Sequence, residues 1–193
     1  MSPNERQVAW HPMVDEAGEV VGQFSSETVI SGIPPAWRGR VIVRSGGVGG
    51  EDPDRAAMRT WGGEGVRMLD EGIERWVGAA GGGDGRLCVW PRACDAVSDL
   101  PSCLSMLRRW EGRGVECVCD PWAMMTRAMV GAGVGDDFVE RVLETLAPNP
   151  WAAFVVIQAG LSAKQVEIAT RFAVLAGKRI VSKPVGFGCE QIP

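Results

Sequence analysis

A chain of 193 residues with 46% hydrophobic and 23% charged residues is long enough to bury a full core, and this composition excludes an intrinsically disordered protein. The net charge of −4 comes without a basic stretch, so the sequence lacks the clustered cations through which proteins release counterions from nucleic acid. It contains no apolar run of transmembrane length, and no run typical of a secretory signal follows the polar start at residues 1–7. We therefore expect a cytoplasmic protein that binds neither nucleic acid nor membranes.

The six cysteines are interpreted as thiols rather than disulfides. The sequence shows no export signal, and a chain of this length does not need covalent cross-links. Cys117 and Cys119 are alternate residues of one expected strand, so their side chains point the same way, which is a poor disulfide geometry. No two cysteines have the Cys-x-x-Cys spacing of a zinc knuckle. We expect reduced, mostly buried thiols.

From residue 40 onward, short β-rich runs alternate with helical patterns. The expected strands are 40–44, 86–90, 115–119, 151–157 and 179–182. The helical segments between them are 53–77, which Gly62-Gly63 divides into two pieces, then a helix that Ser98 caps, 136–146, and a helix from Ser162 to Ala176. The run 151–157 is apolar throughout, which is typical of a strand covered on both faces, so Val155 and Ile157 should be buried.

Five strands separated by four helical segments imply parallel pairing with right-handed crossovers. Residues 40–193 are therefore predicted to form an α/β domain: a parallel (β/α) repeat whose sheet is a partial or trimmed TIM-barrel-like sheet with outer helices. Residues 1–39 fit the repeat poorly and are predicted as an N-terminal extension packed on this domain. Residues 19–24 and 27–30 favour short strands or a hairpin, and the sequence does not decide whether they complete the sheet.

Asp120, directly after the strand 115–119, is the main site candidate. The carboxyl ends of parallel strands meet at one face, the barrel mouth, where ligands are usually held. Asp120 is interpreted as a catalytic general base or polar anchor, or alternatively as a residue that caps the turn before Pro121. Polar or aromatic side chains near the other strand ends are candidate ligand-binding residues: Arg44, Trp90, Trp122, Gln158 and Lys183. Each has a structural alternative, packing for the tryptophans and a solvated loop for the polar residues.

Other common catalytic patterns have little support. The glycine-rich stretch 46–50 departs from a dinucleotide-binding loop at Asp52, and the stretch 131–135 precedes Asp136 and Asp137, which would repel a phosphate. A catalytic triad is not supported, since His11 is the one histidine and no nucleophile elbow is present.

The order of elements from Val41 to about Ser162 resembles the xylose-isomerase-like (β/α) barrels of the sugar phosphate isomerase/epimerase group. The matching features are a strand that ends in Gly-Gly, a long helix, the strand Leu87–Pro91, a helix that begins Ser98-Asp99-Leu100, and a strand that ends in Asp120-Pro121. Since a complete barrel of this kind needs about 250 residues, the resemblance implies a shortened barrel.

The resemblance also implies a metal site, from which this sequence departs. The family's glutamate, its histidine three residues after the aspartate, and its later histidine correspond here to Trp90, Ala123 and Gln158, while Asp120 matches the aspartate. A lone carboxylate does not hold a divalent cation that needs several ligands. We therefore predict neither a bound metal nor a cofactor.

Three functional hypotheses follow. The first is a metal-free, catalytically reduced relative of these barrels that binds a small polar, sugar-like ligand if it binds any. The second is an active isomerase or epimerase that uses Asp120 without a metal, or with ligands from another subunit of a homo-oligomer. The third is a structural or protein-interaction module, suggested by eight tryptophans and by Met124, Met125 and Met129, which could form an exposed apolar patch.

Overall fold

The computed structural model describes residues 10–32, 34, 38–49, 53–79, 84–126, 128–129 and 135–182. Its strands are β1 (Trp10–Val14), β2 (Val20–Thr28), β3 (Arg40–Arg44), β4 (Arg86–Trp90), β5 (Val115–Cys119), β6 (Ala152–Ile157) and β7 (Ile180–Ser182). Its helices are α1 (Pro53–Trp61), α2 (Gly63–Ala79), α3 (Leu100–Arg109), α5 (Gly135–Leu146) and α6 (Ala163–Leu175). The alternation of strands and helices predicted from residue 40 onward is confirmed.

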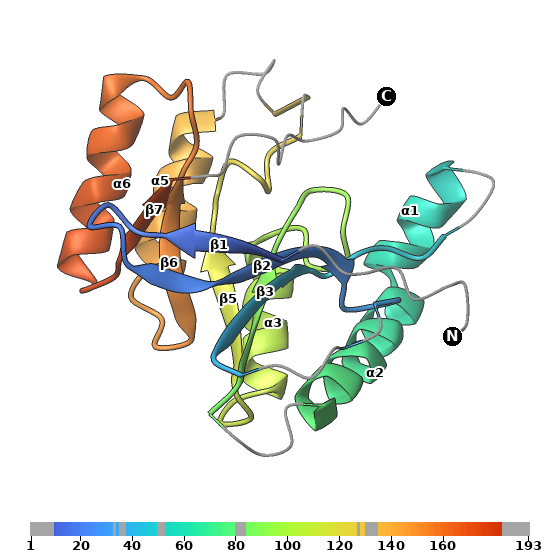
Figure 1. Ribbon diagram of the computed structural model, residues 1–193. Coiled ribbons are helices and arrows are strands. Elements are labelled where there is room, and N and C mark those ends of the chain that lie inside the picture. Colours follow the sequence, from blue (N-terminus) through green and yellow to red (C-terminus); the bar gives the residue numbers. More distant parts are fainter. Residues whose placement is uncertain are drawn as a thin grey trace.

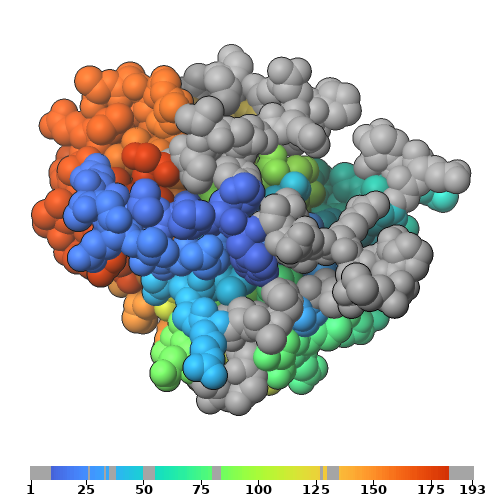
Figure 2. Space-filling view, viewed as in Figure 1, coloured from blue at the N-terminus to red at the C-terminus, as the bar shows by residue number. Residues whose placement is uncertain are grey.

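These seven strands form one sheet in which the spatial order follows the sequence, β1 to β7. β1 pairs with β2 antiparallel, and every later neighbour pair is parallel. A bridge between Asp15 and Val181 brings the β1 end of the sheet to β7. Arg179 reinforces this junction with ion pairs to Asp15 at 3.2 Å and to Glu19 at 3.1 Å. The sheet is therefore nearly closed, and Figure 2 shows the blue β1–β2 hairpin packed against the orange and red C-terminal elements.

The helices lie outside this sheet, so the fold is a partial α/β barrel (Figure 1). Side chains alternate along each strand between a core that faces the helices and a core inside the barrel. The outer core includes Val41, Val43, Leu87, Val89 and Val155. The inner core draws on all seven strands: Met13, Val21, Phe24, Ile42, Cys88, Trp90, Val118, Ala123, Phe154, Val156 and Val181. The barrel interior is therefore packed with apolar side chains.

Residues predicted as an extension supply two strands of this same sheet. The expected short strands 19–24 and 27–30 are one continuous strand, β2, whose residues 23 and 24 pair with 41 and 42 of β3. The turn from β1 to β2 depends on Asp15, whose Oδ1 accepts from the backbone N–H groups of Ala17 and Glu19. Gly18 adopts a φ of 81° in this turn, a conformation that favours glycine. The question that the sequence left open is thus answered, because β1 and β2 complete the sheet.

Helix boundaries match the sequence predictions with one correction. The break at Gly62 is confirmed, and Ser162 caps α6 with its Oγ accepting from Gln165 N at 3.3 Å. The α3 cap is Asp99 rather than Ser98, with Asp99 Oδ1 accepting from Ser102 N at 2.8 Å. A cap at Ser98 would face Pro101 three residues later, and proline has no N–H to donate.

Two burial predictions need correction. Val155 is fully buried as predicted, but Ile157 is half-buried because β6 ends at this residue. The predicted exposed methionine patch is wrong for Met124, which is 2% exposed and belongs to the core between the sheet and the helices. Met125 is half-buried against the same core, so these methionines serve packing.

Candidate functional site

Four of the predicted site residues point toward the barrel mouth. Each follows, by two positions, a residue of the inner core, and residues two apart on a strand share a face. The four are Arg44, Trp90, Asp120 and Gln158, which follow Ile42, Cys88, Val118 and Val156. They therefore lie above the apolar interior, at the carboxyl ends of β3, β4, β5 and β6.

Asp120 is fully buried and, within the described part of the chain, accepts hydrogen bonds from Trp90, Ala123 and Gln158. Trp90 Nε1 donates to Oδ2 at 3.0 Å, and Ala123 N donates to Oδ1 at 3.1 Å. Gln158 Nε2 donates to Oδ1 at 3.0 Å and to Oδ2 at 3.2 Å. We call Asp120, Trp90, Ala123 and Gln158 the Asp120 cluster. Its hydrogen bonds offset the cost of burying a carboxylate and join the ends of three adjacent strands.

The bond from Ala123 N to Asp120 Oδ1 spans the turn that contains Pro121, so Asp120 acts as a turn cap, as one of the two interpretations drawn from the sequence proposed. The other interpretation, a polar anchor or general base, stays a prediction. Trp90 is also packed, because its ring meets Phe24 edge-on with centroids 5.3 Å apart. Packing and hydrogen bonding therefore coincide at Trp90.

Arg44 forms a second polar pair at the barrel mouth. Its guanidinium donates to both carboxylate oxygens of Asp95, at 3.1 Å from Nε and 2.7 Å from Nη2. The Arg44 side chain is 31% exposed, whereas that of Asp95 is 2% exposed. Sequence reasoning missed Asp95. Its position in the loop after β4 was the available signal, since loops that follow parallel strands lie at the barrel mouth.

The remaining two candidates do not join the Asp120 cluster. Trp122 is half-buried and packs against the core that faces the helices, and its buried Nε1 has no hydrogen-bond partner in the described part of the chain. Lys183 lies outside the described residues. The grouping predicted from the strand ends is thus seen for Trp90, Asp120 and Gln158, with Arg44 at the neighbouring strand end.

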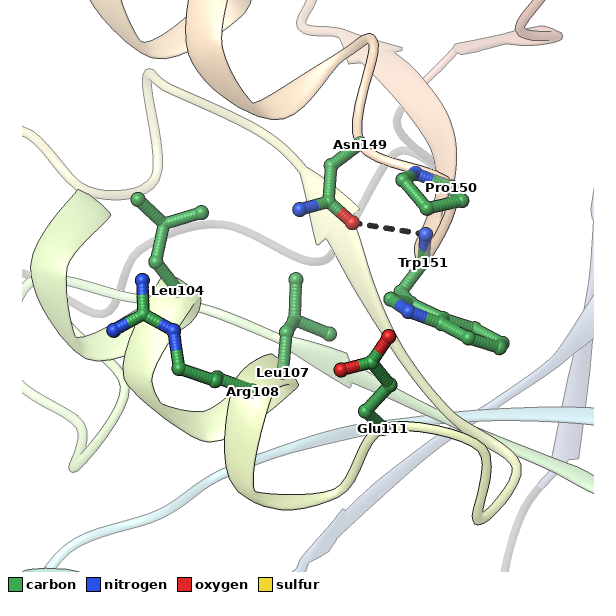
Figure 3. Close-up of a pocket in the computed structure, with 7 residues that line it drawn as sticks. All are labelled: Leu104, Leu107, Arg108, Glu111, Asn149, Pro150 and Trp151. Carbon is green, nitrogen blue, oxygen red and sulfur yellow. Dashed lines mark hydrogen bonds between the residues drawn. The ribbon is translucent and has the colours of Figure 1, made fainter.

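The structure also contains hollows on the helix side of the barrel. Figure 3 shows one of about 200 Å³ between α3 and the segment before β6, lined by Leu104, Leu107, Arg108, Glu111, Asn149, Pro150 and Trp151. Asn149 Oδ1 accepts from Trp151 N at 2.9 Å within it. This volume is below the range of about 300–1,000 Å³ that is typical of ligand pockets. A wider groove of about 680 Å³ runs between α2 and α3, and there Asp70 is engaged by Arg109 and by Trp110 Nε1.

The cysteines of the described chain do not form a reactive site. Five are free, and four of these are buried: Cys88, Cys103, Cys117 and Cys119. Burial raises the pKa of the Cys88 and Cys119 thiols, with the nearby Glu116 and Cys117 respectively adding to the effect. Thiols of this kind stay protonated and are poor nucleophiles.

The Asp120 cluster does not fit the divalent metal that the resemblance implies. Trp90 Nε1, Ala123 N and Gln158 Nε2 all direct N–H groups at the carboxylate, and such groups donate rather than coordinate. Within the described residues there is also no group of three or more histidine, cysteine or acidic side chains placed to hold a metal ion. The cluster can hold a carboxylate in place and present polar groups to a ligand.

Comparisons with known proteins do not assign a family. No protein-family model matches the sequence, and a search of curated proteins gave no significant match. Of the helices in the described residues, none has the length and apolar character to span a membrane. The barrel and its strand-end side chains are therefore the basis for a functional proposal.

Proposed function

We propose that this protein is a metal-free, catalytically reduced relative of the sugar phosphate isomerase/epimerase barrels, a trimmed TIM-barrel-like protein that binds a small polar, sugar-like ligand at the barrel mouth. One observation supports this most directly. The residues at the three positions where the sequence departs from the family's metal ligands are the same residues that donate hydrogen bonds to Asp120.

The chemistry of these donors explains how a metal could be lost. In a metal site the cation compensates the charge of the aspartate. Here the indole N–H of Trp90, the amide of Gln158 and the backbone N–H of Ala123 provide that compensation, at 3.0 to 3.2 Å. The carboxylate is thereby retained in a buried position without a cation.

Partly exposed polar groups at the same face suit a polar ligand. Arg44 keeps 31% of its side chain exposed at the end of β3, and Gln158 is half-buried at the end of β6. Guanidinium and carboxamide groups bind hydroxyl, carboxylate or phosphate oxygens. A fully active isomerase that uses Asp120 would need the substrate to reach a carboxylate that is 0% exposed, so we place binding ahead of catalysis.

The interaction-module alternative has separate support on α1, where Met58 is 74% and Trp61 is 54% exposed. Large exposed apolar side chains of this kind mark protein contacts when they form a patch. Sedimentation of the purified protein alone tests self-association. If Met58 and Trp61 form a contact between two copies, the original protein should sediment as an oligomer and a Met58→Lys/Trp61→Lys variant as a monomer.

A binding screen on metal-depleted protein tests the proposal. The protein is dialysed against EDTA, and thermal unfolding is followed with xylose, glucose, fructose and their phosphate esters. At least one compound should raise Tm, to the same extent with and without EDTA, because a ligand that binds only the folded state stabilises it. Gln158→Leu should remove this shift, while the matched control Gln23→Leu on β2 should keep it.

Two results would overturn the proposal. One is that no compound changes Tm at concentrations up to the millimolar range. The other is that stabilisation requires an added divalent metal, which would favour an active metal-dependent isomerase.

A further inference from the structure

The carboxamide of Gln158 is held in one orientation. Its Nε2 lies 3.0 Å from Asp120 Oδ1 and 3.2 Å from Oδ2. If the carboxamide were rotated by half a turn, its Oε1 would face both carboxylate oxygens, and acceptors repel one another in a buried site. Oε1 is therefore turned away from Asp120.

The exposure of the cluster shows which group a ligand can reach. Asp120 is 0% and Trp90 is 4% exposed, while Gln158 is half-buried at the end of β6. Nε2 faces Asp120, and Oε1 is not among the buried side-chain oxygen and nitrogen atoms that lack a partner in the described chain, so the exposed part of the carboxamide includes Oε1. In the described part of the chain no donor contacts Gln158 Oε1. This oxygen is an available acceptor at the barrel mouth.

We infer that Asp120 is a positioning residue, which fixes Gln158 so that Oε1 accepts a hydrogen bond from the ligand. This inference rests on the proposed function and deepens it by naming the ligand's chemistry. The group that meets Gln158 is a donor, such as a sugar hydroxyl. A phosphate or carboxylate oxygen is disfavoured at this point, because it would face another acceptor.

The first variant removes the fixed orientation. In Asp120→Asn the side chain at position 120 has one acceptor oxygen and one amide, so both orientations of the Gln158 carboxamide can find a partner. Affinity for a neutral sugar should fall about threefold to tenfold, which is the contribution of one hydrogen bond to binding. Affinity for the corresponding sugar phosphate should fall less, so the preference for the sugar over its phosphate should become smaller. Asp137→Asn, an exposed acid-to-amide change on α5, is the control and should alter neither.

The second variant restores an acceptor. In Asp120→Asn/Gln158→Glu, one carboxylate oxygen at position 158 accepts from the new amide at position 120, and the other faces the barrel mouth. Affinity for the neutral sugar should return to within about threefold of the original protein. A residue with a purely structural role would not be rescued by this exchange.

The measurement is a titration of each protein with glucose and with glucose 6-phosphate, and in parallel with xylose and its 5-phosphate, followed by the indole N–H resonance of Trp90 and the side-chain amide of Gln158. The inference is supported if Asp120→Asn has a smaller preference for the sugar over its phosphate and the double variant recovers its affinity for the neutral sugar. An equal loss for sugar and sugar phosphate without recovery overturns it and leaves the proposed function in place. If neither sugar nor ester perturbs these resonances in the original protein, the proposed function fails and this inference fails with it.

Discussion

Replacing Trp90 by Phe tests whether the buried indole N–H stabilises Asp120. The substitution keeps an aromatic ring beside Phe24 but removes the donor that lies 3.0 Å from Asp120 Oδ2. A hydrogen bond to a charged group contributes about 1.5–3 kcal/mol. The smaller ring also leaves a cavity, which adds a packing cost. The hydrogen-bond contribution must therefore be separated from the loss of volume.

Trp76→Phe provides that separation. Trp76 is 0% exposed, and among the described residues its Nε1 has no hydrogen-bond partner, so the same substitution there removes volume without breaking a bond. We expect the free energy of unfolding, measured by urea denaturation, to fall at least about 1.5 kcal/mol further in Trp90→Phe than in Trp76→Phe. Equal losses in the two variants would refute the view that the Asp120 cluster is held by its N–H donors.

Three further predictions follow from the burial and chemistry of particular residues. Val155→Ala should lower the free energy of unfolding by about 1–4 kcal/mol and Ile157→Ala by less, because Val155 is fully buried and Ile157 is half-buried. A larger loss in Ile157→Ala than in Val155→Ala would contradict this assignment of burial along β6. Burial raises the pKa of Cys88 and Cys119 above their ordinary value of 9.0, so the folded state holds these protons more tightly, and their contribution to stability is complete below pH 9.0 and lost above it. Urea denaturation at pH 8 and pH 10 should show the loss, which should be smaller in Cys88→Ala, and a pH-independent free energy of unfolding would contradict it. Elemental analysis should find no stoichiometric metal, whereas one zinc, manganese or cobalt per chain that is lost in Asp120→Ala would revive the metal-dependent enzyme.

The strand-end grouping could be predicted from the sequence because two simple rules determine it. Parallel strands deliver their carboxyl ends to one face, and the alternation of side chains decides which residues point inward. Trp90, Asp120 and Gln158 satisfy both conditions, so their proximity could be predicted without knowing any contact. Asp120 and Gln158 directly follow their strands, whereas Trp122 lies three residues beyond the end of β5, in a turn where the alternation no longer applies, and it packs against the outer core.

The closure of the sheet could not be predicted, since it depends on distant segments. β2 has the sequence VVGQFSSET, in which serine, glutamate and threonine weaken the apolar signal of a strand. The junction of β1 with β7 rests on Asp15, Val181 and Arg179, which are more than one hundred and sixty residues apart at the extremes. No local pattern reports such a contact. The pairing of Arg44 with Asp95 is similar, because it joins a strand end to a loop 51 residues later.

Chemical-shift mapping tests the central claim most directly, namely that a small polar ligand binds at the barrel mouth around Asp120. Backbone and side-chain amide resonances are recorded while the metal-depleted protein is titrated with the same sugars and sugar phosphates. We predict that the largest perturbations fall on Arg44, Trp90, Asp120 and Gln158, at the carboxyl ends of β3 to β6. Perturbations confined to the hollow between α3 and the segment before β6, around Leu107 and Trp151, would contradict it.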